Sequence, residues 1–154
     1  MLSDNSLNEP NWLYFNRLKI TELPPLPDNV EYLCCYGCPN LTKLPDVLPP
    51  GLRVLDCRHC HKLEKLPDVL PETLTHIYAI HCNCMTELPI NLPKSLTVIC
   101  CNNSINLCKL PDNLPNRLQT ICINNCKNIS SLPILPKSCN EVYFYDTNIT
   151  SIVM

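Results

Sequence analysis

The sequence lacks the long apolar stretches and the strong charge excess that would assign it at once to a membrane or nucleic-acid class. No apolar run reaches the roughly 18–20 residues that a membrane-spanning helix needs. The net charge of −2 gives no electrostatic reason to expect a nucleic acid or an anionic membrane as partner. Met1 to Asn11 are polar and carry no basic flank before an apolar block, so we expect no secretory signal.

Glycine is scarce, whereas proline and cysteine are abundant. The 154 residues include 2 glycines, 16 prolines and 13 cysteines. The prolines alternate with leucine at fixed intervals, which argues for order and against the disorder of many proline-rich chains. An odd number of cysteines without a secretory signal indicates free thiols in a reducing compartment. We therefore expect a cytoplasmic protein.

The dipeptide Leu-Pro recurs with a fixed period along the chain. It begins at Leu44, Leu66, Leu88 and Leu110, each 22 residues after the last, and a second Leu-Pro starts four residues after each of these. Aligned on these marks, the units begin at Val30, Leu52, Leu74, Leu96, Leu118 and Cys139, after a divergent first unit from about Glu9. A regular period of this length is typical of solenoids. We expect a single domain over residues 1–154, with an N-terminal segment at 1–8 and about seven rungs over 9–154.

Each unit follows the pattern apolar-x-x-apolar-x-apolar-x-x-Cys/Ser/Thr and ends in the Leu-Pro pairs. The alternation around the second and third apolar positions predicts a short strand, and equivalent strands would stack in parallel about 4.8 Å apart. Proline lacks an N–H and disfavours helix in the residue before it. The pattern therefore predicts a right-handed solenoid with short parallel strands on the concave face and an extended, polyproline-like convex side. A helix is expected only at the N-terminus, over Ser3 to Glu9.

The Leu-x-x-Leu-x-Leu-x-x-Asn/Cys pattern is the leucine-rich-repeat signature. With its doubled Leu-Pro, the 22-residue unit resembles the short LPX class of bacterial type III effectors. Residues 92–99, Leu-Pro-Lys-Ser-Leu-Thr-Val-Ile, are also similar to repeat proteins of amoeba-infecting giant viruses, including the marseillevirus group. The resemblance covers about residues 9–154. It implies a leucine-rich-repeat protein that binds other proteins, with a host factor as the partner if the viral or effector resemblance holds.

Two departures from these families limit what the resemblance implies. Bacterial effectors of this class often carry a ubiquitin-ligase domain with a catalytic Cys-x-Asp, and no Cys-x-Asp occurs in this sequence. The asparagine that usually occupies the ninth position of the unit is replaced by Cys38, Cys60, Cys82, Ser104, Cys126 and Thr147. Thiols and hydroxyls can still donate a hydrogen bond there, although thiols do so weakly.

Two Cys-x-x-Cys pairs, Cys35 with Cys38 and Cys57 with Cys60, are separated by 18 residues, a spacing found in zinc ribbons. The repeat offers a second explanation, because both members of each pair fall at inward-facing positions where a small buried residue packs well. We prefer packing and keep a metal site between adjacent rungs as the alternative. No cofactor is expected.

The cysteines expected on the outer face of the sheet also raise the question of a catalytic nucleophile. Cys34 and Cys122 would point outward, and His76 could neighbour Asp56 in the next rung. No cysteine lies at a spacing that would let His76 act as its base, so His76 is better explained as a surface histidine. We therefore expect no enzymatic activity.

Residues that flank the inward strand positions should form the surface available to a partner. Among them the repeat register places five of the six tyrosines on the outward side, which strand propensity alone does not explain. Tyrosine and arginine are frequent interface anchors. The predicted partner-binding residues are Phe15, Tyr32, Tyr36, Arg58, Tyr78, Tyr143 and Tyr145.

Three functions remain in competition at this point. The leading one is a non-catalytic protein-interaction module, whether a viral or an effector protein, acting in the host cytoplasm or, if viral, in the virion. The second is a structural subunit of a virus particle or assembly, which would self-associate as a homodimer through the apolar last rung, Tyr143-Phe144-Tyr145 and Ile149 to Met154. The third is a thiol- or metal-binding protein. No nucleic acid and no membrane is expected as partner.

Overall fold

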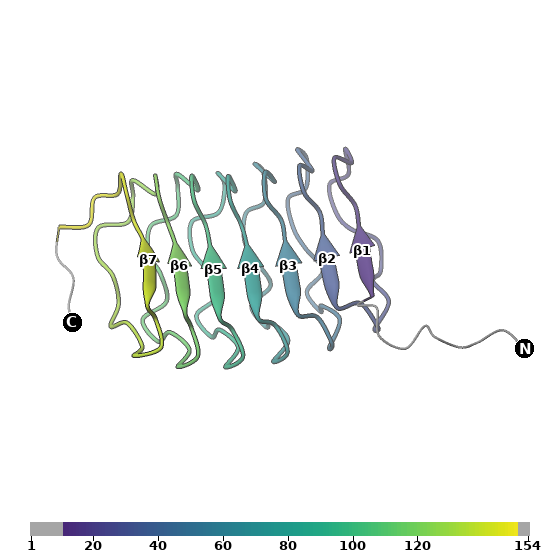
Figure 1. Cartoon of the computed structure of the whole chain (residues 1–154). Coiled ribbons are helices and arrows are strands. Elements are labelled where there is room, and N and C mark those ends of the chain that lie inside the picture. The colour runs from purple at the N-terminus through teal and green to yellow at the C-terminus, as the bar shows by residue number, and fades with distance from the viewer. Residues whose placement is uncertain (1–10, 151–154) are drawn as a thin grey trace, which may run out of the picture.

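The computed structural model describes residues 11–150 as a stack of seven short strands in one parallel sheet. The strands are β1 (Trp12–Tyr14), β2 (Tyr32–Cys34), β3 (Val54–Asp56), β4 (His76–Tyr78), β5 (Val98–Cys100), β6 (Thr120–Cys122) and β7 (Glu141–Tyr143). They lie side by side in chain order, so each rung contacts only its neighbours (Figure 1). The predicted solenoid of short parallel strands is confirmed.

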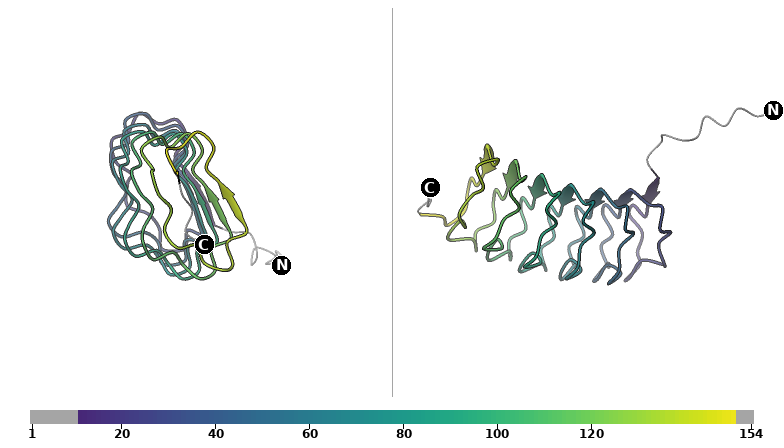
Figure 2. Two further views of the ribbon diagram at one scale, coloured as in Figure 1. Left: turned by 90° about the vertical axis from the view of Figure 1, so that its left-hand side faces the viewer. Right: turned by 90° about the horizontal axis from the view of Figure 1, so that it is seen from below.

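The sheet occupies one side of the stack and the return segments occupy the other (Figure 2). Residues 11–150 contain no helix, and so none that could cross a membrane. Each repeat from β3 to β6 opens with a turn in which the N–H of a leucine donates to the carbonyl of the proline three residues earlier, as Leu52 N does to Pro49 O at 3.0 Å. Proline thus breaks helix through its missing N–H and still supplies a turn acceptor. The helix expected over Ser3 to Glu9 lies outside the described residues.

The core is a set of parallel columns that run the length of the stack. The middle strand residues Leu33, Leu55, Ile77, Ile99 and Ile121 are all 0% exposed, and each is paired in register with the next. The leucines that begin the units and the leucines that precede the first Leu-Pro of each unit form further columns beside the middle strand residues. Each fully buried side chain of this size contributes about 1.5–3 kcal/mol. Stability therefore accumulates rung by rung, as expected of a solenoid.

The first rung departs from the predicted register by one residue. Trp12 is paired with Tyr32 and Tyr14 with Cys34, so Trp12 and Tyr14 point outward while Leu13 and Phe15 pack against the core. The prediction that Phe15 lies on the outward face is therefore wrong. The divergent first unit is shorter than the 22-residue period, and a shift of one residue moves every strand side chain to the opposite face.

Every strand is followed by a residue in the left-handed backbone region, with φ between 55° and 69°. These residues are Arg17, Gly37, His59, His81, Asn103, Asn125 and Asp146. The first six of them donate their N–H groups to the next rung, as His59 N does to Ile80 O at 2.7 Å and Asn103 N to Asn124 O at 2.8 Å. Asparagine and glycine adopt this conformation most readily. The turn therefore continues the ladder beyond the three-residue strands and aligns the turn residues of successive rungs along the edge of the sheet.

The ninth position of the unit forms a second ladder, made by side chains. Cys60 Sγ donates to Cys35 O at 3.0 Å, Cys82 Sγ to Cys57 O at 3.1 Å, and Ser104 Oγ to Ala79 O at 2.7 Å. Cys38 and Cys126 make the same bond to the preceding rung, whereas Thr147 Oγ1 donates within its own rung, to Phe144 O. The expected donation by thiols and hydroxyls is confirmed. These cysteines connect rungs as the usual asparagine would.

Candidate partner-binding surface

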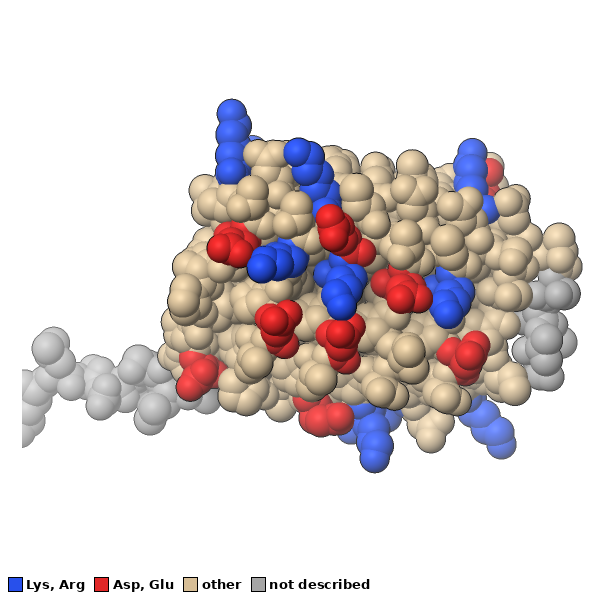
Figure 3. Space-filling view, turned by 180° about the vertical axis from the view of Figure 1, so that it is seen from behind, with Lys and Arg blue, Asp and Glu red and all other residues tan. Residues whose placement is uncertain are grey.

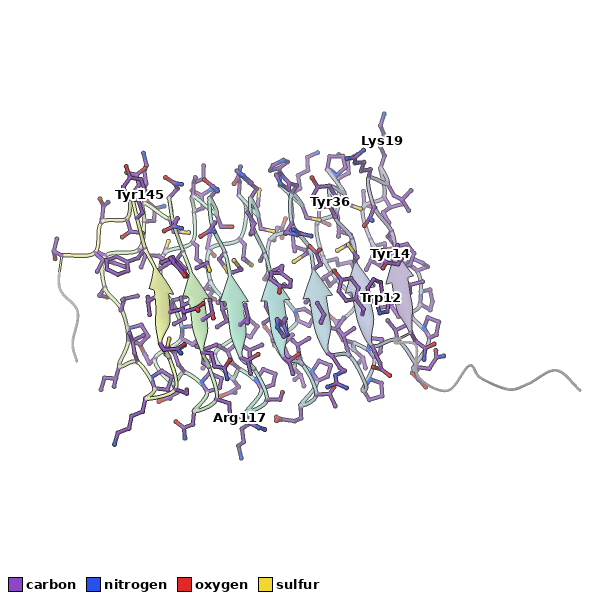
Figure 4. The ribbon with its side chains drawn as sticks, in the orientation of Figure 1. Trp12, Tyr14, Lys19, Tyr36, Arg117 and Tyr145 are labelled. Atoms are coloured by element: carbon purple, nitrogen blue, oxygen red, sulfur yellow. The ribbon has the colours of Figure 1, made fainter. Side chains whose placement is uncertain are left out.

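The outer face of the sheet, here called the sheet face, consists of the first and third residues of each strand and the residue two places after the strand. Over β1 to β4 it carries a group of large aromatic side chains, which we call the aromatic cluster: Trp12, Tyr14, Tyr32, Tyr36 and Tyr78. The rings of Trp12 and Tyr32 stack with centroids 4.8 Å apart, and the Tyr14 ring lies 5.8 Å from Trp12. Trp12 is 54% exposed and Tyr14 is 49% exposed. Both belong to β1, at the N-terminal end of the sheet (Figure 4). Packed but accessible aromatic rings of this kind are typical of interfaces.

A buried carboxylate anchors the cluster from below. Asp56 ends β3 on the sheet face and is nevertheless fully buried. Its Oδ1 accepts hydrogen bonds from Arg58 N at 3.1 Å and Arg58 Nε at 2.9 Å, and its Oδ2 accepts from Arg58 Nη2 at 2.7 Å. The Tyr32 hydroxyl donates to Oδ2 at 3.4 Å. The carboxylate is thus shared between an arginine and a tyrosine and has no need of water.

Arg58 is held in one position by this carboxylate and two aromatic rings. Its guanidinium carbon lies 5.6 Å from the ring centroid of Tyr36 and 5.8 Å from that of Tyr78. A bidentate ion pair and two cation–π contacts fix the planar group. Its side chain remains 42% exposed. Arg58 therefore presents a fixed positive charge between two tyrosines, with little side-chain entropy left to lose on binding.

The same contacts keep the protonation states constant over the physiological range. Burial, followed by the negative charge of Asp56, raises the pKa of Tyr32 to about 12. Hydrogen bonding to Asp56 raises the pKa of Arg58 further above its already high ordinary value. Tyr32 therefore remains a hydrogen-bond donor and Arg58 remains a cation.

Three histidines lie along the edge of the sheet beside the aromatic cluster. The rings of His59 and His81 stack at 4.6 Å, His61 lies 5.9 Å from His59, and Tyr36 meets His59 edge-on at 5.2 Å. Burial, then the neighbouring His59 and His61, lowers the pKa of His81. His81 is therefore neutral at pH 7 and gains charge only in acid.

The C-terminal half of the sheet face has a different character. Asn102 Oδ1 accepts from Asn124 N at 2.8 Å, and Asn124 Oδ1 accepts from Tyr145 N at 2.7 Å. Tyr143 and Tyr145 are 50% and 80% exposed on the last rung. Amide side chains thus occupy the row in which Arg58 lies in the third rung.

The predicted site residues consequently fall into three groups. Tyr32, Tyr36, Arg58 and Tyr78 are brought together, Tyr143 and Tyr145 lie three rungs further along, and Phe15 faces the core. Trp12 and Tyr14 were missed because the first rung was read one residue out of register. The structural role of Asp56 was also missed, since an acidic residue at an outward position gives no sign in the sequence that it will be buried.

The return side of the stack contrasts with the sheet face. Lysines and acidic residues are interspersed over it (Figure 3), and several form exposed ion pairs: Lys43 with Glu22, Lys65 with Asp68 and Lys109 with Glu87. Exposed pairs of this kind contribute little energy and keep a surface well solvated. The accessible aromatic area therefore concentrates on the sheet face.

The candidate metal ligands Cys35, Cys38, Cys57 and Cys60 are all buried and all donate to backbone carbonyls. Hydrogen bonding to Cys60 and burial raise the pKa of Cys35 well above its ordinary value. Burial likewise raises the pKa of Cys38, whereas hydrogen bonding to Cys35 lowers the pKa of Cys60. Metal binding requires thiolates, which this environment disfavours at Cys35 and Cys38. Within residues 11–150 no three histidine, cysteine or acidic side chains are grouped so that they could hold a metal ion. Packing as the explanation of the Cys-x-x-Cys pairs agrees with the burial of the four thiols and with their bonds to carbonyls.

The fold matches solved structures of bacterial effectors. YopM from Yersinia enterocolitica WA-314 superposes with a TM-score of 0.71 and 25% identity, over 87% of this chain and 28% of that one. YopM from Yersinia pestis, described as a leucine-rich effector protein, superposes with a TM-score of 0.63 and 30% identity, over 86% of this chain and 42% of that one. The chain thus spans less than half the length of either protein. No protein-family model and no curated protein sequence matches it.

These matches agree with the repeat pattern and with the geometry of the sheet. They support the resemblance to bacterial leucine-rich effectors. They give no support to the resemblance to giant-virus proteins. The period, the seven stacked parallel strands and the ladder at the ninth position all point the same way. The chain has the leucine-rich-repeat solenoid fold.

Proposed function

We propose that this chain is a non-catalytic recognition module that binds a protein partner through the N-terminal half of its sheet face. The observation that carries the proposal is the fixed Arg58, bonded to a buried carboxylate and lying between two tyrosine rings. Arginine and tyrosine dominate interface energetics when they are held in place before binding. The similarity to a leucine-rich effector supports the class of function. We further propose that the partner is a protein of a host cell and that binding takes place in the host cytoplasm.

The energetics of the aromatic cluster favour a protein surface as the occupant. Each large aromatic side chain contributes on the order of 150–250 Å² when it is buried. Trp12 and Tyr14 are already packed against Tyr32, so the ordering cost on binding is small. Arg17, with its guanidinium carbon 5.9 Å from the Tyr36 ring centroid, adds a second cation at the edge. A partner that places apolar side chains on the rings and carboxylates on the arginines would complement this surface.

The test uses affinity capture with matched variants of the full chain. Tyr36→Ala and Tyr78→Ala remove the two rings that contact Arg58. Ile90→Ala is the control, because Ile90 is an exposed apolar residue on the return side. We expect specific partners to be lost with the tyrosine variants and kept with the control, as measured by quantitative mass spectrometry of the captured proteins. Retention of every specific partner by both tyrosine variants would contradict the proposal.

We propose self-association as a second function, on a separate observation. Val142 and Phe144 in the last rung are only half-buried, whereas their equivalents Ile121 and Ile123 are fully buried. The last rung therefore leaves part of a core column uncovered within residues 11–150, and a second copy of the chain is the occupant that we propose. Residues 151–154, which the sequence prediction also included, lie outside the described residues.

Sedimentation equilibrium over a wide concentration range tests this second proposal. We expect a reversible dimer that Phe144→Asp weakens, with Ile134→Asp on the exposed return side as the control. A monomer at every concentration would rule the dimer out.

A further inference from the structure

Two cysteines on the C-terminal half of the sheet face are directly opposite one another. Cys100 ends β5 and Cys122 ends β6, and the two residues are paired in register. Both are partly exposed. Residues opposite each other in neighbouring strands lie about 4.8 Å apart, so the two thiols leave the same surface side by side.

These two cysteines differ from the cysteines that hold the rungs together. The ninth-position thiols are buried and each donates to a carbonyl of the preceding rung. In contrast, Cys100 Sγ receives a long contact of 4.0 Å from Asn102 Nδ2, and after burial a hydrogen bond with Cys122 contributes to its raised pKa. The pair therefore has thiols that no backbone carbonyl engages.

The surroundings of the two thiols are aromatic and small side chains, with the Glu141 carboxylate at the margin, where it accepts from Thr120 Oγ1 at 3.1 Å. In the same row of the sheet Tyr78 is paired with Cys100 on one side, and Tyr143 is paired with Cys122 on the other. The preceding outward residues on the two strands are Val98 and Thr120. Two soft sulfur ligands between two aromatic side chains suit a soft electrophilic centre that carries an organic substituent.

The chemistry of the pair selects reactions that use both thiols at once. Burial and the neighbouring Cys122 raise the pKa of Cys100 to about 12, so the thiol carries its proton at pH 7. A protonated thiol is a poor nucleophile for one-site alkylation. A ligand that bonds to both sulfurs gains from their fixed proximity on the sheet, since the second bond forms within one molecule.

We propose that Cys100 and Cys122 form a dithiol site that binds trivalent organic arsenic compounds. In the hydrated form R–As(OH)2, two As–O bonds break and two As–S bonds form. Each thiol proton leaves with one hydroxyl, so two water molecules are released and no electrons are transferred. The site adjoins the aromatic cluster at Tyr78, which is paired with Cys100, and its occupation does not require the proposed protein partner.

Titration of the full chain with phenylarsine oxide tests the proposal, with intact-mass measurement of the product. We expect one phenylarsenic group per chain at low reagent excess, which ethanedithiol reverses. Cys100→Ser and Cys122→Ser should each weaken binding by at least about a hundredfold, because either change leaves a single thiol. Cys108→Ser is the matched control, since Cys108 is exposed and does not belong to the pair.

A second measurement on the unaltered protein makes the result independent of variant folding. Phenylarsine oxide should protect Cys100 and Cys122 from alkylation by iodoacetamide in mild urea, as read by peptide mapping. Protection of a different pair, or loss of binding in Cys108→Ser as large as in Cys100→Ser, would overturn the assignment. So would wild-type affinity in either serine variant of the pair.

Discussion

The two halves of the sheet face share one backbone and differ in almost everything that the backbone presents. Over β1 to β4 the outward rows hold aromatic rings, a buried carboxylate and a fixed arginine. Over β5 to β7 the same rows hold thiols, amides and two exposed tyrosines. The strands are paired in the same parallel register in both halves. The repeat therefore determines positions, and the residues at those positions determine chemistry.

The largest expected effect is a loss of stability in core variants, and it tests whether the two halves of the stack are equally stable. Leu55 in β3 and Ile121 in β6 are both 0% exposed and occupy one core column. Leu55→Ala and Ile121→Ala should each lower the free energy of unfolding by about 2–5 kcal/mol. Urea unfolding followed by circular dichroism measures both. A loss in one half several times that in the other would show that the halves are not equivalent in stability.

The next effect concerns binding. Trp12→Ala should weaken the binding of an identified partner by about 2 kcal/mol, or roughly thirtyfold in affinity, because it removes the centre of the aromatic stack. Tyr145→Ala, at an exposed residue of the C-terminal half, should change the affinity less. Calorimetric titration of both variants gives the comparison. A larger loss with Tyr145→Ala would move the binding surface to the other half.

A smaller difference in stability is expected between variants that remove a polar acceptor from each half of the sheet face. Asp56→Ala leaves Arg58 and Tyr32 without their acceptor and should cost about 1–3 kcal/mol of stability. Asn124→Ala removes the acceptor of the Tyr145 N–H, a single neutral bond, and should cost about 1 kcal/mol. Chemical unfolding of the two variants in parallel distinguishes them. Equal costs would mean that the buried carboxylate stabilises the fold no more than an amide.

The smallest effect is a pH dependence confined to the N-terminal half. Burial and the neighbouring imidazoles lower the pKa of His81, so between pH 7 and 5 the unfolded chain binds more protons at this residue than the folded chain. This contribution to stability is present above the ordinary histidine pKa and is lost as the pH falls. His81→Asn places there the residue found at the equivalent Asn103 and Asn125 turns.

The variant should therefore lose less stability than the unaltered chain between pH 7 and pH 5. Thermal unfolding at the two pH values measures the difference. Asn103→Ala, at the equivalent turn of the next rung, is the control for a change of backbone preference alone and should keep the original pH dependence. An unchanged pH dependence in His81→Asn would contradict the contribution assigned to His81.

Much of the fold followed from local chemistry. The missing N–H of proline excluded helix from the return side, and the alternation of apolar residues gave one strand per unit, both as the structure has them. The ninth-position thiols were expected to donate between rungs, and they do. The first rung was read incorrectly because its unit is shorter than the others and carries no Leu-Pro mark before it.

The candidate site was only partly predictable. The sequence placed Tyr32, Tyr36, Arg58 and Tyr78 on one face, because a strand alternates its side chains regardless of what surrounds it. The contacts among them depend on distances between rungs that lie more than 20 residues apart in the chain. The hydrogen bond of Asp56 to Tyr32 belongs to that second kind of information, whereas its ion pair with Arg58 joins two residues of one rung.

The sequence by itself determined the period, the strand in each unit and the extended return, since each depends on residues close together in the chain. The tertiary structure alone decided the register of the first rung, the burial of Asp56, the fixed orientation of Arg58 and the pairing of Cys100 with Cys122. The physical reason is that hydrogen bonding between rungs fixes which residues become neighbours. Only then do charge, ring stacking and thiol chemistry act between them.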